Sequence, residues 1–526
     1  MIEGTLQSRV DELFKSALSE TINQPGLEHF HRLLQRCQQQ LDQPMRVAIV
    51  GLIKAGKSTM MNALLGEAVV ATGNVEATFN VNFLRYGDRP SLIVHFKNHR
   101  SPEVKSFAEL AALTVRADSH RDYLLSIKYI EVVYPNTILE TFNLIDTPGL
   151  LSYYKDDSEN TLEFLQLYGQ KLAEVTQAET EGADAVLYLF SHSLATEDKQ
   201  IVEMFQGPIV GQATPINAIG VLTKVDSYWS DPNVSEPMEA GNRICQRLSA
   251  HPQIRNILYT IYPTCGLLAF GAQTLTHDEW KILTQLAQSV PEDRMHRLIA
   301  NVQRFCAREY SDVPISPSQR QQLFNRLGQY GIWLAYTLIL SGVNNQAQLT
   351  DELLKRSGIT QLRDLILSHF GHRSYLIKLS KVLQEIKVAS FIYQPNIPVK
   401  QQQIVKNIAG LFEELEAQEH GFSELRVLRN YYEKKLDFDE NEVTQMLEVT
   451  GEGGTSCSER LGLSQLATIE EMLSVAKERM HYWQKKAYDY LASDTTSTNA
   501  AGVLARSYER IVYRLQMAKE YLNFYG

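Results

Sequence analysis

A glycine-rich loop near residue 50 has the residue types and spacing needed to hold phosphate. GLIKAGKS (51–58) fits G-x-x-x-x-G-K-[ST], and it stands between the apolar run MRVAIV and the helix-forming run STMMNALLGE. Glycines let successive backbone N–H groups point at phosphate oxygens, and the N-terminus of the following helix adds a favourable dipole. The sequence therefore predicts nucleotide contacts at Gly51, Lys54, Ala55, Gly56, Lys57, Ser58 and Thr59.

Side chains in and after this loop are candidates for catalysis and for metal binding. Lys57 is expected to reach the β- and γ-phosphates, and the Ser58 hydroxyl to bind Mg²⁺. A threonine further on should bind Mg²⁺ and touch the γ-phosphate. Thr72 and Thr78 both qualify, and Thr78 is favoured because it directly precedes the next strand-like run. Lys54 is either a positive charge beside the phosphates or a solvated loop lysine, and both interpretations stay open.

The segment DTPG (146–149) follows the apolar run FNLID. A carboxylate at a strand tip beside a phosphate loop can hold Mg²⁺, commonly through water, and the Gly149 N–H can sense the γ-phosphate. Alone, Asp-Pro-Gly indicates no more than a turn. Its position downstream of the glycine-rich loop makes Asp146 a predicted metal-binding residue and Gly149 a predicted nucleotide contact.

Two further segments concern the base. TKVD (223–226) follows INAIGVL, and its Asp226 can accept hydrogen bonds from guanine N1–H and the exocyclic amine, a pair that adenine lacks. Lys224 can lay its stem over the base, and Thr223 completes the motif. In PTCG (263–266), backbone N–H groups at Thr264 and Cys265 are candidates to meet guanine O6, although a plain loop after a strand is nearly as good an explanation.

Short apolar runs alternate with helical patterns between residues 45 and 270, which predicts an α/β domain with a mostly parallel sheet and helices on both faces. The runs VNFLRY (81–86) and LIVHF (92–96) are so closely spaced that a local antiparallel hairpin is expected.

Helical periodicity dominates both flanks. Two amphipathic stripes, from Val10 to Ala17 and from Leu27 to Leu41, predict two N-terminal helices that must pack on something later in the chain. After about residue 275 breaks fall at 394–398, 450–456 and 493–502, dividing the C-terminal part into three or four long helices.

Composition excludes several classes of protein. The net charge of −10 disfavours a general nucleic-acid binder. Five widely separated cysteines indicate neither a disulfide framework nor a zinc site, and favour a reducing cytoplasm. No apolar stretch reaches the ~18–20 residues that a bilayer-spanning helix needs. IWLAYTLIL (332–340) is interpreted as a buried helix rather than a membrane-inserting segment. The cations of RSYLIKLSK (373–381) either touch lipid head groups or, as we favour, form the solvated face of a helix.

Together, the phosphate loop, DTPGL and TKVD resemble the dynamin superfamily, and bacterial dynamin-like proteins in particular. The intervals between these motifs are longer than in small regulatory GTPases, and SGITQLRDLILSHF (357–370) resembles the segment that closes the dynamin-type GTPase domain. The resemblance implies a GTPase domain over 45–372, mainly helical after about residue 275, on a helical bundle built from both flanks. We therefore expect N-terminal helices over 1–44 to pack in that bundle and the bundle or stalk itself to extend over 373–526. It also implies GTP, GDP and Mg²⁺ as ligands, self-association through the GTPase domain, in some cases with a second dynamin-like chain, and membrane remodelling in many members.

Two departures concern catalysis. Eukaryotic members carry a Gln-Ser pair where this chain has Ile53 and Lys54, and Leu150 follows DTPG, so no glutamine stands there to orient the attacking water. Catalytic help must then come from Lys54 or from a second molecule. The favoured hypothesis is an Mg²⁺-dependent GTPase, cytoplasmic or peripheral at the inner face of a membrane, whose hydrolysis is coupled to self-assembly. The alternative is a GTP-switched interaction protein with low turnover.

Overall fold

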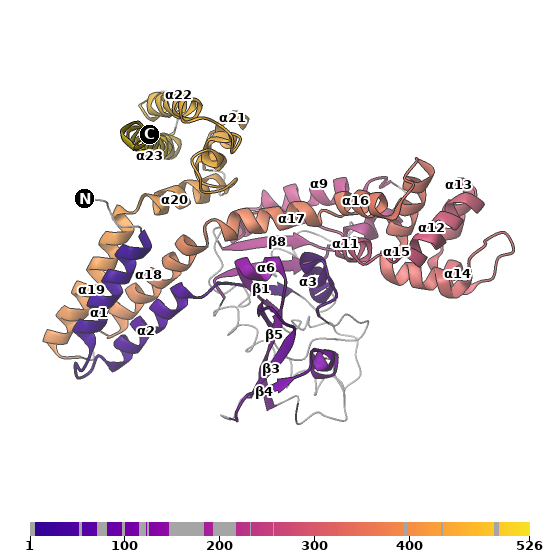
Figure 1. The fold of residues 1–526 in the computed structure, drawn as a ribbon, viewed down its shortest axis with the longest axis horizontal. Coiled ribbons are helices and arrows are strands. Elements are labelled where there is room, and N and C mark those ends of the chain that lie inside the picture. The colour runs from indigo at the N-terminus through magenta and orange to yellow at the C-terminus, as the bar shows by residue number, and fades with distance from the viewer. Residues whose placement is uncertain are drawn as a thin grey trace. The chain divides into compact units, whose positions relative to one another are not determined.

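The structure is a computed structural model, and it describes residues 6–51, 55–70, 82–96, 100–114, 123, 126–146, 183–192, 217–231, 233–255, 257–393, 397–432, 435–488 and 494–525. Two compact units make up the chain (Figure 1). The α/β unit comprises Arg46–Leu365, and the helical unit combines Met1–Met45 with Ile366–Gly526.

Nine strands in the described residues form one sheet, in the order β4-β3-β5-β2-β6-β1-β7-β8-β9. Their bounds are β1 Met45–Gly51, β2 Asn82–Tyr86, β3 Ser91–Phe96, β4 Glu103–Lys105, β5 Ile127–Tyr134, β6 Phe142–Asp146, β7 Ala185–Phe190, β8 Ala218–Leu222 and β9 Ile261–Pro263. From β1 through β7 and β8 to β9 the pairing is parallel, whereas β2 is antiparallel to β6 and parallel to β5. Every residue of β6, β7 and β8 is buried, as expected for apolar strands covered on both faces.

The predicted α/β fold is confirmed, but the predicted hairpin is wrong. Strand β5 lies between β2 and β3, parallel to the first and antiparallel to the second. The apolar run of β5 therefore fills the place where the hairpin partners would have met. Close spacing along the chain did not reveal this, because pairing depends on which strand buries its side chains best and not on loop length alone.

Helices pack on the sheet and extend beyond it. Those of the α/β unit are α3 Lys57–Leu65, α4 Leu110–Thr114, α6 Thr137–Thr141, α9 Pro237–Ser249, α10 Pro252–Arg255, α11 Gly266–Gln273, α12 His277–Ser289, α13 Glu292–Ile299, α14 Val302–Ala307, α15 Pro317–Leu340, α16 Gln346–Ser357 and α17 Ile359–Ile366. The run 332–340 lies in α15, where Ile332, Ala335 and Tyr336 are fully buried. The interpretation of this run as core is confirmed.

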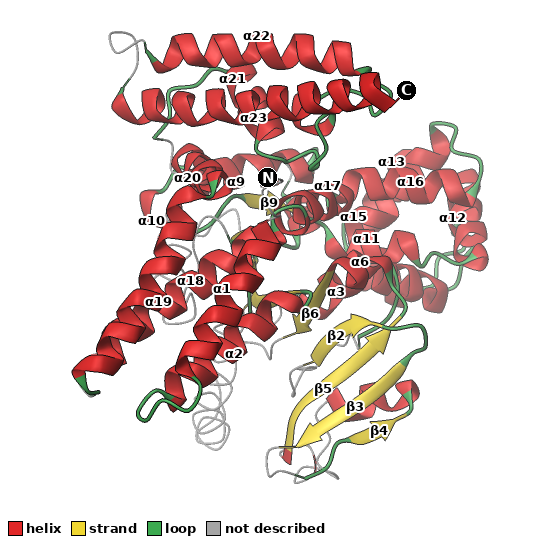
Figure 2. Ribbon diagram, turned by 60° about the vertical axis from the view of Figure 1, so that its left-hand side comes forward, coloured by secondary structure: helices red, strands yellow, loops and turns green. Residues whose placement is uncertain are grey.

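Both flanks contribute to one four-helix bundle in the helical unit (Figure 2). Helices α1 Leu6–Thr21 and α2 Glu28–Asp42 pack on each other, on α18 Ser374–Tyr393 and on α19 Val399–Gln418. Phe14 of α1 meets Phe412 of α19 with ring centroids 4.9 Å apart. The N-terminal stripes thus find the later partner that their periodicity requires.

The rest of the helical unit consists of α20 His420–Tyr432, α21 Glu440–Val449, α22 Ile469–Ala487 and α23 Thr495–Tyr525. The expectation of three or four C-terminal helices is too low, and the expected break at 493–502 is largely helix. Asp494 explains the second error. Its carboxylate accepts hydrogen bonds from the Thr496 and Ser497 N–H groups at 2.7 and 3.1 Å, so a polar run that reads as a break is a helix start.

The expectation of a solvated basic face over 373–381 is wrong for two of its cations. Arg373 and Lys378 are 4% and 5% exposed. The Lys378 ammonium donates to the carbonyls of Leu41 and Gln43, each at 2.6 Å, and the Arg373 guanidinium donates to the Thr450 carbonyl at 3.2 Å. Both cations thus satisfy carbonyls at helix C-termini, which lack intrahelical donors.

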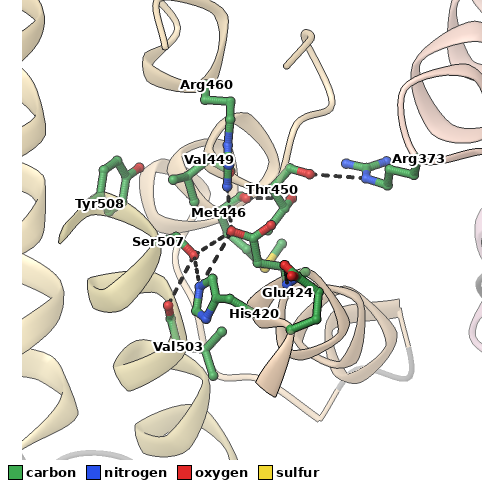
Figure 3. Close-up of polar contacts among 12 residues, drawn as sticks. Arg373, His420, Glu424, Met446, Val449, Thr450, Arg460, Val503, Ser507 and Tyr508 are labelled. Carbon is green, nitrogen blue, oxygen red and sulfur yellow. Dashed lines mark hydrogen bonds and ion pairs between the residues drawn. The ribbon is translucent and has the colours of Figure 1, made fainter. Parts of the chain in front are cut away.

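A buried polar network joins α20 to α23 and to the loop after α21 (Figure 3). Glu424 accepts hydrogen bonds from the Arg460 guanidinium at 2.5 Å and the Ser507 hydroxyl at 2.7 Å. Ser507 also lies 2.8 Å from His420 Nε2. Burial lowers the pKa of His420, against the opposite effect of Glu424. This network cross-links helices that are distant in sequence.

None of the helices in the described part of the chain is both long enough and apolar enough to span a bilayer.

Candidate nucleotide-binding site

The phosphate loop leaves the sheet where β1 ends. A Cβ at Gly51 would collide with the Leu189 carbonyl oxygen of the neighbouring β7, so this position needs glycine. Gly56 has a φ of 84°, in the left-handed region, and helix α3 begins at the next residue. Ser58 and Thr59 are half-buried in the first turn of α3. The α3 N-terminus thus stands directly after Gly56, where the motif predicts the phosphate.

Lys57 is 8% exposed, and its ammonium donates to the Gly51 carbonyl at 3.2 Å across the loop. Burial lowers the pKa of Lys57, and the nearby Asp146 carboxylate opposes that shift. A buried ammonium that donates to a backbone carbonyl of the loop is well placed to exchange that bond for one to a phosphate oxygen.

Asp146 ends β6 and is 1% exposed. Directly across the antiparallel pair stands Asn82, the first residue of β2, whose amide Nδ2 lies 3.5 Å from Asp146 Oδ2. Asn82 escaped the sequence analysis because an asparagine at the start of an apolar run carries no motif. The cross-strand register alone brings it to the site.

Thr223 ties the base motif to the phosphate loop. Its hydroxyl lies 2.8 Å from the Ala55 carbonyl and 3.1 Å from the Phe190 carbonyl. The Thr223 side chain therefore fixes the end of β8 against the loop, so the two predicted segments of the site are one connected structure.

Asp226 lies in the short helix η4 Val225–Ser230. Lys224 directly precedes this helix and has a φ of 58°, in the left-handed region. Burial raises the pKa of Asp226, and its own backbone and Lys224 oppose the shift. Gly328 interrupts α15 with a φ of 69°, and a Cβ there would stand 3.6 Å from Asp226 Oδ2. The kink in α15 therefore lets that helix pass close to the predicted base-reading carboxylate, a contact that the sequence alone did not indicate.

The PTCG segment lies next to the base motif, but two of its N–H groups are occupied. Thr264 N donates to the Leu222 carbonyl and Cys265 N to the Ser357 carbonyl, both at 2.8 Å. A guanine O6 would have to replace one of these bonds, so the assignment of Thr264 and Cys265 stays a prediction.

The predicted residues Lys54, Thr78 and Gly149, with the alternative Thr72, lie outside the described residues. The structure does describe the chain up to Val70, just before the segment that holds the two threonines. Buried Asn62 of α3 accepts hydrogen bonds from the Val69 and Val70 N–H groups at 3.0 and 2.9 Å. It thereby anchors the point where the chain enters that segment.

Oxygen ligands suited to Mg²⁺ gather beside Lys57. The Asp146 carboxylate is buried next to the first turn of α3, which carries the Ser58 hydroxyl, and the buried Asn82 carbonyl oxygen has no hydrogen-bond partner among the described residues. Hard cations prefer such oxygen donors. The residues present therefore fit the metal that the motifs predict.

Together, a phosphate loop after β1, a carboxylate at the tip of β6 and a TKVD turn after β8 define a P-loop GTPase domain. Residues 47–225 match the model of the Dynamin family. Isoniazid-induced protein IniC of Mycobacterium tuberculosis is 29% identical over 479 residues, covering 91% of this chain and 92% of that protein. Dynamin-like protein 2 of Campylobacter jejuni is 30% identical over 170 residues, covering 31% and 27%. These matches support membership of the dynamin superfamily, and residues 47–225 carry the match to its GTPase domain.

One similar solved structure is described as an oligomerised bacterial dynamin pair that provides a mechanism for the long-range sensing and tethering of membranes. The alignment spans 99% of this chain and 93% of that one, at 14% sequence identity and a TM-score of 0.33.

Proposed function

We propose that this protein hydrolyses GTP to GDP and phosphate. The observation that carries the proposal is that buried Lys57, buried Asp146 and the Thr223–Asp226 turn stand at the ends of β1, β6 and β8 of one sheet, with Thr223 bonded to the phosphate loop. In this proposal the loop is the phosphate cradle, Asp146 the metal-binding carboxylate and Asp226 the guanine-reading carboxylate. Adenine nucleotides would leave Asp226 without its two donors.

In this mechanism water attacks the γ-phosphorus in line with the leaving β-phosphate oxygen. Lys57 exchanges its bond to the Gly51 carbonyl for the β- and γ-phosphate oxygens, and the N–H groups of the loop and of the first turn of α3 stabilise the growing negative charge. Ser58, Thr78 and Asp146 are the proposed ligands of Mg²⁺, which when bound neutralises phosphate charge. Asp226 selects the base.

Self-association supplies what the loop lacks. Leu150 stands where a glutamine could orient the attacking water, so the motifs of this chain lack a side chain for that step of fast hydrolysis. We propose that a second copy, or a second dynamin-like chain, completes it when GTPase domains pair, with Lys54 as the contributing cation within the chain. Turnover is then coupled to assembly.

Membrane contact is the second part of the proposal, and an apolar tip of the four-helix bundle supports it. Val388, Phe391 and Ile392 are 45%, 64% and 63% exposed on the last turns of α18, and Val399 is 80% exposed at the start of α19. Ile22, at the end of α1, is 56% exposed.

The turn between α1 and α2 lies at the same end of the bundle, because a Cβ at Gly26 would lie 3.6 Å from Ile397 Cγ2 (Figure 2). These five apolar side chains, with the exposed Lys400 beside them, suit the apolar and anionic layers of a lipid surface. We name Ile22, Val388, Phe391, Ile392 and Val399 the apolar tip.

The apolar tip is tested with the double substitution F391S/I392S and the matched control L466S, since Leu466 is 91% exposed elsewhere in the helical unit. Burial of a large apolar side chain contributes about 1.5–3 kcal/mol. The double variant should therefore sediment with anionic liposomes at least tenfold more weakly, and L466S as strongly as the unaltered protein. Equal loss in both variants, or in neither, removes the assignment of the tip.

Hydrolysis itself is tested by phosphate release from GTP and from ATP. We expect release from GTP but not ATP, and Lys57→Ala should lower kcat at least about 100-fold, the usual effect of losing a donor that stabilises the transition state. A protein that binds GTP tightly and releases no phosphate at any concentration would support the alternative, a GTP-switched interaction protein.

A further inference from the structure

Asn82 is buried beside the metal-binding carboxylate, although it belongs to none of the recognised motifs. It opens β2 four residues after Thr78, and it pairs in register with Asp146 of β6. Its side chain is 1% exposed. An apolar side chain at position 82 would pack there without the cost of desolvating polar atoms, so the presence of an amide needs a reason.

The two ends of the amide behave differently. Nδ2 lies 3.5 Å from Asp146 Oδ2, on the donor side, whereas Oδ1 is buried and accepts no hydrogen bond from the described residues. A buried acceptor without a partner costs about 1–3 kcal/mol, and such groups in native structures commonly point to an absent water or ion. The amide is thus oriented with its donor on the carboxylate and its acceptor open.

The surroundings indicate which species that acceptor serves. Lys57 is close enough to Asp146 for the carboxylate to affect its pKa, so the buried Asp146 carboxylate has the Lys57 ammonium near it as well as the Asn82 amide. Mg²⁺ in such sites keeps several of its waters, and each coordinated water is a strong hydrogen-bond donor. A water held on Mg²⁺ supplies the donor that Asn82 Oδ1 lacks.

We propose that Asn82 is a positioning residue of the metal site: Nδ2 orients Asp146, and Oδ1 accepts a hydrogen bond from a water coordinated to Mg²⁺. The inference rests on the proposed function, because it requires that Mg²⁺ binds with the nucleotide. It assigns to this chain a polar support of the metal that acts across the β2–β6 pair, outside the phosphate loop and the DTPG motif.

The test measures Mg²⁺ dependence rather than turnover. Dissociation of a fluorescent GDP analogue is followed in the full chain over a range of free Mg²⁺ and in excess EDTA. Asn82→Leu, close to the asparagine in volume, should raise the Mg²⁺ concentration that gives half-maximal retention about tenfold, while the affinity in EDTA stays within about twofold. Asn82→Gln keeps both the amide donor and the oxygen acceptor and should hold that midpoint within about threefold of the unaltered protein.

A second buried asparagine of the same unit is the control for general destabilisation. Asn136 caps α6 by accepting from the Ile138 N–H at 3.1 Å and donates to the Leu65 carbonyl at 2.8 Å. Asn136→Leu should lower the melting temperature and leave the Mg²⁺ midpoint unchanged.

Three results would overturn the inference. They are an unshifted midpoint in Asn82→Leu, an equal shift in Asn136→Leu, or a midpoint in Asn82→Gln as high as in Asn82→Leu. Failure of the unaltered protein to bind GDP with or without Mg²⁺ would instead overturn the proposed function, and this inference with it.

Discussion

Asp226 is the residue to which we assign base selection, and its surroundings sharpen that assignment. Its carboxylate is held between the exposed Lys224 and the kink of α15 at Gly328. Burial raises the pKa of this carboxyl because it destabilises the ionised form. Hydrogen-bond donors on a bound base would stabilise that form. Guanine N1–H and its amine are such donors.

Asp226→Asn should therefore shift preference from GTP towards xanthosine triphosphate, whose base presents a carbonyl in place of the amine. Hydrogen bonds to a charged group contribute about 1.5–3 kcal/mol, so the ratio of the two kcat/KM values should change about ten- to hundredfold. Competition between the two nucleotides for the same variant measures it. A ratio equal to that of the unaltered protein would refute the role of Asp226.

His420 makes one part of the stability depend on pH. The groups around it are Ser507, Glu424 and the arginines Arg460, Arg506 and Arg510, and burial, the largest cause, lowers its pKa below 6.5. Between that lowered pKa and 6.5 the unfolded chain binds a proton that the folded chain does not. This contribution to stability is therefore fully present above pH 6.5 and is lost as pH falls towards the folded pKa.

His420→Gln keeps a side-chain N–H without a group that titrates in this range. The free energy of unfolding of the unaltered protein should fall between pH 6.5 and 5.5 more steeply than that of the variant, by at most about 1.4 kcal/mol per pH unit. Urea unfolding at several pH values gives both slopes. Parallel slopes would contradict the assignment.

At the scale of elements, the structure depends on how helix ends find hydrogen-bond donors. Lys378 of α18 donates to two carbonyls at the end of α2, and Arg460 and Arg373 donate to the carbonyls of Val449 and Thr450 at the end of α21. These cations come from elements that are distant in sequence or follow a loop. They fix where each helix stops relative to its neighbours.

Lys378→Met keeps the length of the side chain and removes its donors. The carbonyls of buried Leu41 and exposed Gln43 then lose a donor, and the helical unit should lose about 1–3 kcal/mol of stability. Urea unfolding followed by circular dichroism measures the loss. Lys400→Met, at an exposed position of α19, is the control and should change stability by less than about 0.5 kcal/mol. Equal stability of the two variants would show that the cation does not cap α2.

Periodicity and motifs predicted the strands around the site well, because continuous apolar runs such as those of β7 and β8 leave few alternatives. The phosphate loop and TKVD were readable because each performs its chemistry with residues close in sequence. Asn82, Asn62 and Gly328 were not readable, since their roles arise from cross-strand register, loop anchoring and a helix kink. The buried cations of 373–381 were misjudged for the same reason: their partners lie at helix ends far along the chain.

At the scale of the whole molecule, the helical unit is made of both chain flanks. In the sequence, the α/β unit therefore stands between the two segments that form one bundle. The first stripe predicted from sequence is buried at Val10 and Phe14, and its partner α19 comes almost four hundred residues later. The sequence indicated that a partner was needed but not which helix it was. The resemblance to the dynamin superfamily supplied the expectation that helices from both flanks form one bundle.

The central claim is that GTP hydrolysis by this chain is coupled to its assembly. The direct measurement is the rate of GTP turnover per molecule against protein concentration, with and without anionic liposomes, for the unaltered protein and for F391S/I392S. The account predicts a rate per molecule that rises with concentration and rises again with lipid, and a variant that keeps the first rise and loses the second. A slow rate per molecule that stays constant over all concentrations, with or without lipid, would contradict it.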